Sequence, residues 1–222
     1  MPILFTQKSP VIGIWKIEEP WQELLESLHK NEVFRQNTLN HVYNIKSDKR
    51  KQEWLAVRVL LTHLAGNDTY IDYHENGAPV LKNSPYNISI SHTTGFAAVI
   101  LSSNKSPGID IEYHSGRAWK LREKYLGEKE LEMFDTLHDD MRISDDKLSE
   151  QAKFATICWC AKETAYKALG QTEVDFIDHM HILPFTLSGE GILSLKETKT
   201  PLQQTFKINY QITKEYIFTW KE

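Results

Sequence analysis

The sequence predicts a mixed α+β fold, and three patterns carry this prediction. Stretches with apolar residues every three or four positions, typical of helices, alternate with runs rich in β-branched residues, typical of strands. Cap and turn residues such as Ser47-Asp48, Pro107-Gly108 and Gly170 separate these stretches. The order helices, strands, helix, strands indicates two similar α+β halves, at residues 1–107 and 108–222.

The first half is expected to begin with helices and to continue in strands. Residues 19–33 carry apolar side chains at helical spacing, and Pro20 suits a first helical turn. A second helix is predicted over 49–64, directly after the cap signal. Short strands are predicted from the β-branched and aromatic residues of three later runs, at 69–74, 86–92 and 95–103.

The second half is expected to open with a strand at 108–113 and to continue with helical character over 118–137, broken near Gly127. The acidic stretch 128–150 is interpreted as a solvent-exposed helix and loop. A long helix is predicted from about 149 to 169, ended by Gly170, and the tail from 182 onward alternates as strands do.

Composition and charge exclude several classes of protein. The chain has 222 residues, 41% of them hydrophobic and 25% charged, as in ordinary globular proteins. A net charge of −4 argues against nucleic acid as a partner, and no apolar run approaches the roughly 18 residues of a membrane span. No signal peptide is recognisable, and the only cysteines, Cys158 and Cys160, are too close for a useful disulfide. We therefore expect a cytoplasmic protein.

Two acidic residues on one predicted strand require a compensating charge. In the segment 108–113 (GIDIEY), alternation places Asp110 and Glu112 on the same face of the strand. The segment contains no Lys or Arg that could relieve their repulsion. Water, a basic partner elsewhere in the chain or a metal ion could compensate.

The long predicted helix carries a second group of charges. Glu163 and Lys167 lie four residues apart, one turn from each other on one face, with Trp159 one turn earlier. Such a pair is ordinarily a surface ion pair, but the remaining residues of this helix are largely apolar. Burial of unpaired charges is unfavourable, so these side chains need partners.

Taken together, the three carboxylates predict a metal site. Asp110, Glu112 and Glu163 offer oxygen ligands, and no His or Cys cluster accompanies them, so the pattern favours Mg²⁺ before Zn²⁺. Mg²⁺ in proteins commonly completes its shell with substrate phosphates. Lys167 would then place a positive charge near the same phosphates, which indicates phosphoryl-type chemistry.

Two further segments could contact phosphate. Ser91 and His92 end a predicted strand and offer a hydroxyl and an imidazole, although they could equally satisfy the hydrogen bonds of a hairpin turn. Arg50 and Arg58 belong to the basic stretch 46–58, which is more ordinarily a solvated helix face but could contact phosphate.

These motifs resemble those of the 4′-phosphopantetheinyl transferases, in particular the longer, surfactin-synthetase-activating type. That family carries a Gly-(Ile/Val)-Asp-(Ile/Val)-Glu strand followed by a Trp-x-x-Lys-Glu-x-x-x-Lys helix, matched here at 108–112 and 159–167. An upstream Asn-Ile-Ser-x-Ser-His element is matched at 87–92. The resemblance spans 49–170, with one departure at Ala78, where the family has a lysine.

The resemblance implies two similar α+β halves related by a pseudo-twofold axis, with the active site in the cleft between them. It implies transfer of 4′-phosphopantetheine from coenzyme A to a serine of an acyl or peptidyl carrier protein, with release of adenosine 3′,5′-bisphosphate. Asp110, Glu112 and Glu163 would hold Mg²⁺, for which Mn²⁺ could substitute. Glu163, or a water on the metal, would take the serine proton, and Lys167 would offset charge on the phosphate. Contacts to coenzyme A are expected from Ser91, His92, Lys162, Lys167, Arg50 and Arg58.

Two alternatives remain open from the sequence. The chain could be another Mg²⁺-dependent phosphate-ester enzyme, which would need no carrier protein, or a non-catalytic module that binds coenzyme A or a carrier. Retention of both Glu163 and Lys167 argues against the second alternative. A monomer without nucleic-acid or membrane partners is expected, and the sequence does not select a carrier protein.

Overall fold

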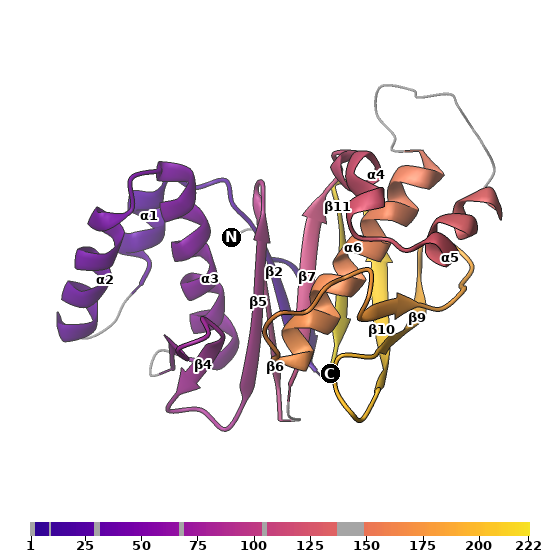
Figure 1. Cartoon of the computed structure of the whole chain (residues 1–222). Coiled ribbons are helices and arrows are strands. Elements are labelled where there is room, and N and C mark those ends of the chain that lie inside the picture. Colours follow the sequence, from indigo (N-terminus) through magenta and orange to yellow (C-terminus); the bar gives the residue numbers. More distant parts are fainter. Residues whose placement is uncertain (1–2, 9, 29–31, 67–68, 104–105, 137–148) are drawn as a thin grey trace. The chain divides into compact units, whose positions relative to one another are not determined.

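The fold was analysed in a computed structural model, which describes residues 3–8, 10–28, 32–66, 69–103, 106–136 and 149–222 (Figure 1). The chain forms two compact units, Met1–Pro107 together with Glu222, and Gly108–Lys221. Both contain helices and strands, so the predicted mixed α+β class is confirmed. The pseudo-twofold relation between two similar halves stays a prediction.

The first unit consists of an antiparallel sheet in the order β1-β2-β6-β5, helices and a two-stranded hairpin, β3-β4. Helix α3 packs closely on the sheet at Gly13 of β2, where an added Cβ would meet Leu60 Cδ1 at 2.8 Å. The elements are β1 (Ile3–Lys8), β2 (Val11–Lys16), α1 (Trp21–Glu26), α2 (Glu32–Asn44), α3 (Asp48–Ala65), β3 (Tyr70–Tyr73), β4 (Pro79–Lys82), β5 (Asn87–Thr93) and β6 (Phe96–Ser102).

The second unit consists of an antiparallel sheet in the order β7-β11-β10-β9-β8 and the long helix α6, which lies against β7 and β11 (Figure 1). Ser149 caps α6 by accepting from the Ala152 amide, and Gly170 ends it in a left-handed conformation (φ 63°). The elements are β7 (Gly108–Tyr113), α4 (Arg117–Leu121), η1 (Arg122–Lys124), α5 (Glu128–Leu131), η2 (Glu132–Thr136), α6 (Glu150–Leu169), β8 (Met180–Ile182), β9 (Glu190–Glu197), β10 (Thr205–Ile212) and β11 (Tyr216–Lys221).

The structure corrects the sequence prediction in three places. The hairpin β1-β2 was not predicted, although Val11–Lys16 has the β-branched residues of a strand. The single helix expected at 19–33 is a short α1, followed after residues 29–31 by a second helix, α2. The helical stretch expected at 118–137 is divided into four short pieces up to Thr136, and residue 137 lies outside the described part.

The helices of the described residues were compared with the length and hydropathy that a membrane span requires. Of the helices described there, none is long and apolar enough to cross a membrane. The longest, α6, buries its apolar residues within the second unit, where they pack with the residues of the sheet.

Candidate active site

Strand β7 and helix α6 bring two of the predicted site residues into direct contact. The Lys167 ammonium donates to Asp110 Oδ1 at 2.7 Å and to the Ile109 carbonyl oxygen at 2.9 Å. Asp110 is buried, while the side chain of Lys167 keeps 25% of its surface exposed. The two motifs, far apart in the sequence, therefore meet in one place.

The backbone of β7 packs closely on α6 and so permits this contact. A Cβ added at Gly108 would collide with the Thr164 carbonyl oxygen. The Thr164 hydroxyl also lies 2.6 Å from the Thr219 hydroxyl of β11, which pairs with β7. Only glycine at 108 allows this spacing, so the glycine of the GIDIEY segment positions the helix that carries Glu163 and Lys167.

Glu163 is the residue of the site with the largest electrostatic perturbation. Burial and the nearby Asp110 carboxylate raise its pKa from 4.5 to about 7, with a smaller contribution in the same direction from Glu112. The Lys167 ammonium acts in the opposite direction. Glu163 therefore interacts with both of the other predicted carboxylates, and its environment favours the protonated form.

The chemistry of these donors, three carboxylates, fits a hard divalent cation. Among the described residues, no group of three or more His, Cys, Asp or Glu side chains lies in a position to hold a metal ion. The Lys167 ammonium bonds to Asp110 instead. A cation would relieve the mutual repulsion that raises the pKa of Glu163. Metal binding by Asp110, Glu112 and Glu163 stays a prediction.

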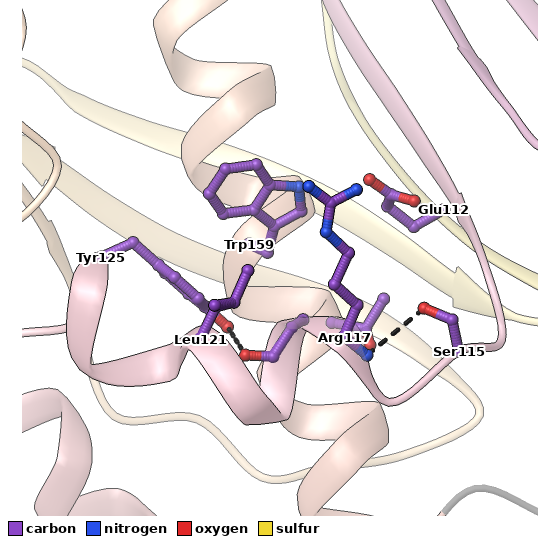
Figure 2. Close-up of a pocket in the computed structure, with 8 residues that line it drawn as sticks. Glu112, Ser115, Arg117, Leu121, Tyr125 and Trp159 are labelled. Atoms are coloured by element: carbon purple, nitrogen blue, oxygen red, sulfur yellow. Dashed lines mark hydrogen bonds between the residues drawn. The ribbon is translucent and has the colours of Figure 1, made fainter.

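A pocket lies beside Glu112, between α4 and α6 (Figure 2). Figure 2 shows the Arg117 guanidinium directed toward the Trp159 ring and the Glu112 carboxylate. The Tyr125 hydroxyl donates to the Ala118 carbonyl oxygen at 3.2 Å, which fixes one wall. The pocket is lined by Glu112, Ser115, Arg117, Ala118, Leu121, Tyr125, Thr156 and Trp159.

Most of the pocket wall was missed by the sequence analysis. Arg117 and Tyr125 follow the GIDIEY strand by only a few residues, so proximity in sequence was the available signal. Arg117 and Tyr125 line the same pocket because the chain breaks into the short elements α4, η1 and α5, and the spacing of apolar residues in the sequence did not reveal these breaks. Arg117 places a positive charge beside Glu112 of β7.

Lys162, from which a contact to coenzyme A was expected, bonds to protein groups in this structure. Lys162 is fully buried, and its ammonium donates to the Tyr125 carbonyl oxygen, to Glu130 Oε2 and to the Phe176 carbonyl oxygen, at 2.7, 2.7 and 2.8 Å. These three acceptors use all three N–H donors. Glu130, in turn, is buried, so the expected solvent exposure of the acidic stretch does not hold at this residue.

Apart from Lys162 and Lys167, the predicted contacts to coenzyme A lie in the first unit, where Arg50 and His92 lie beside the buried Glu53 carboxylate. The Arg50 guanidinium donates to Glu53 Oε2 at 3.0 Å, and His92 Nδ1 lies 3.5 Å from the same oxygen. Both side chains remain partly exposed, 64% for Arg50 and 35% for His92. Ser91 is buried in β5. Arg50 and His92 therefore keep surface for a ligand.

Arg58 is placed differently from Arg50. Its guanidinium lies 3.2 Å from the centre of the Trp54 ring and donates to the Trp54 carbonyl oxygen and the Tyr73 hydroxyl. Burial lowers its pKa to about 10. This packing leaves little of the Arg58 side chain exposed, and its contact to coenzyme A stays a prediction.

Comparisons with known proteins agree with the geometry of the second unit. A family model described as the 4′-phosphopantetheinyl transferase superfamily matches residues 106–220, which include all of β7 and α6. A search of curated proteins gave no significant match. The matched segment covers more than half of the chain. The chain therefore belongs to the 4′-phosphopantetheinyl transferase superfamily.

Proposed function

We propose that this protein transfers 4′-phosphopantetheine from coenzyme A to a serine hydroxyl of an acyl or peptidyl carrier protein. We further propose that it is of the longer, surfactin-synthetase-activating type, with a first unit that contributes to coenzyme A binding. The observation that carries the proposal is the Lys167–Asp110 contact beside Glu163, within the segment that matches the family model.

The reaction needs one new bond and one broken bond. The serine oxygen attacks the phosphorus that carries pantetheine, and the bond from that phosphorus to the bridging oxygen of the pyrophosphate breaks. Adenosine 3′,5′-bisphosphate leaves with the bridging oxygen. Such phosphoryl transfers depend mainly on positioning and on neutralising charge.

The carboxylate and the ammonium on α6 supply complementary parts of this chemistry. Glu163, whose pKa is raised by burial and by Asp110 in the metal-free protein, accepts the serine proton in this proposal. Lys167 offsets negative charge on the phosphates. When bound, Mg²⁺ or Mn²⁺ held by Asp110, Glu112 and Glu163 would supply further positive charge at the pyrophosphate.

Two groups outside α6 support substrate binding in this proposal. Arg50 and His92 keep exposed surface and are held beside Glu53, so they can contact a phosphate of coenzyme A. Arg117 adds a positive charge at the pocket beside Glu112. Neither group needs to move a proton in the reaction.

The proposal is tested by mass spectrometry of several apo carrier proteins incubated with coenzyme A, Mg²⁺ and this protein. The expected result is a mass increase of one phosphopantetheine on a carrier, and the carrier that reacts identifies the pathway served. Hydrolysis of coenzyme A without a carrier would favour the other phosphate-ester enzyme. Binding without any turnover would favour the non-catalytic module.

A further inference from the structure

A buried ion pair lies directly beside the proposed general base. Lys162 precedes Glu163 on α6, is 0% exposed, and bonds to Glu130 Oε2 at 2.7 Å. Its ammonium also donates to the Tyr125 carbonyl oxygen, directly after η1, and to the Phe176 carbonyl oxygen, in the segment that follows α6. One side chain thus ties three segments to a single turn of the helix.

Glu130 extends these connections to α5 and to the sheet. Its Oε2 also accepts from the Gly127 amide at 2.8 Å, and its Oε1 accepts from the Ile182 amide of β8 at 2.8 Å. The carboxylate therefore accepts three hydrogen bonds from three different segments, counted with the one from Lys162. Because these hydrogen bonds are directional, the pair fixes how α5, α6 and β8 are oriented relative to one another.

Stability alone does not account for this arrangement. Removing two charges from water is costly, and a buried pair can often be replaced by apolar residues without loss of stability. Burial indeed lowers the pKa of Lys162, although the Glu130 carboxylate acts in the opposite direction. We therefore ask which side chains the hydrogen bonds of this pair hold in place.

Glu163 lies between two anchored neighbours. Lys162 is held by Glu130, while on the other side Thr164 bonds to Thr219 of β11 and packs under Gly108. Successive residues project about 100° apart around a helix, so these anchors together fix the rotation of this turn. With that rotation fixed, the Glu163 side chain is presented to Asp110.

We propose that Lys162 and Glu130 are positioning residues, which hold the turn of α6 in the rotation that presents the Glu163 carboxylate to Asp110 and Glu112. This inference rests on the proposed function, in which Glu163 takes the proton. Neither residue touches substrate, since both are buried. Their effect is on the placement of Glu163.

The test compares Glu130→Gln, Lys162→Met and the double variant with Glu128→Gln and Lys129→Met, which alter exposed charges of α5. In steady-state transfer assays of folded protein, we expect kcat to fall about 10-fold to 100-fold in each single variant. We expect KM for coenzyme A to change less than about twofold, since the pair binds no substrate. The α5 controls should match the wild type.

The double variant separates positioning from stability. Loss of both charges should restore most of the thermal stability that a single substitution removes. We expect kcat to stay low, because the bonds that orient the turn are still missing. Recovery of kcat together with stability, or unchanged kcat in the single variants, would overturn the inference.

Failure of the proposed function would be recognised separately. If wild-type protein modifies no carrier, the proposed function fails, whatever the variants do. In that case, the position of the Glu163 carboxylate in crystal structures of the wild type and of Glu130→Gln tests the positioning inference by itself. A Glu163 carboxylate displaced from Asp110 in the variant supports it, and an unchanged carboxylate contradicts it.

Discussion

At the scale of single residues, Glu163 is the most informative group, because its environment favours the neutral form. Burial and Asp110 raise its pKa to about 7, compared with 4.5 for an unperturbed glutamate. The folded state therefore binds more protons than the unfolded state between these two values. The raised pKa of the proposed general base therefore lowers the stability of the folded state near neutral pH.

This environment predicts a pH-dependent stability. Without divalent metal, the free energy of unfolding should fall as pH rises from about 5 to 8, by up to about 3 kcal/mol from Glu163. Glu163→Gln should remove this part of the pH dependence, and Glu150→Gln, exposed on the same helix, should keep it. Urea unfolding at several pH values measures it. Parallel profiles for wild type and Glu163→Gln would contradict the account.

A second residue-scale prediction concerns Lys167. In Lys167→Met, transfer should slow about 100-fold, because a positive charge near the phosphates is lost. Mg²⁺ should bind at least as tightly, since the ammonium no longer bonds to Asp110 Oδ1. Calorimetry with Mg²⁺ and steady-state assays test both parts, with Lys129→Met as the control. Loss of Mg²⁺ binding together with activity would argue against the proposed separation of roles.

At the scale of elements, the site depends on the close packing of β7 on α6. Gly108→Ala should push the two apart, because the added Cβ meets the Thr164 carbonyl oxygen. We expect a loss of about 1–3 kcal/mol in the free energy of unfolding and slower transfer by the folded fraction. Gly189→Ala is the matched control, since nothing lies within 4 Å of its added Cβ. Equal stability of the two variants would refute the packing argument.

The same two elements show what the sequence could predict. Alternation in GIDIEY and the caps Ser149 and Gly170 give β7 and α6 close to their observed bounds, because these signals are local. The partner of Lys162 could not be predicted in this way. Glu130 lies 32 residues away, within a helical stretch whose breaks depend on packing and not on periodicity. Local sequence patterns therefore predict which charged residues lie in the site, but they do not predict the long-range contacts that orient these residues.

At the scale of the whole molecule, the chain divides its proposed tasks between two units. The family model matches almost all of the second unit, which carries the acidic residues and Lys167. The first unit carries Arg50 and His92 beside Glu53. If the proposed function holds, chemistry and coenzyme A binding should respond to different substitutions.

This division predicts a separation of kinetic constants. Arg50→Met should raise KM for coenzyme A about tenfold, the scale of one charge-assisted contact, and leave kcat near the wild-type value. Lys46→Met, an exposed charge just before α3, should leave both constants unchanged. Steady-state kinetics at varied coenzyme A measures the effect. An unchanged KM in Arg50→Met would remove this residue from the coenzyme A site.

The central claim is that the acidic residues of β7 and α6 form a phosphopantetheine transfer site. Intact-mass spectrometry of an apo carrier, after incubation with coenzyme A, Mg²⁺ and either wild type or Glu163→Gln, tests it most directly. The account predicts a gain of one phosphopantetheine per carrier and an equal amount of adenosine 3′,5′-bisphosphate with wild type, and a rate lower by orders of magnitude with the variant. Unmodified carriers with wild-type protein, or equal rates for both proteins, would contradict it.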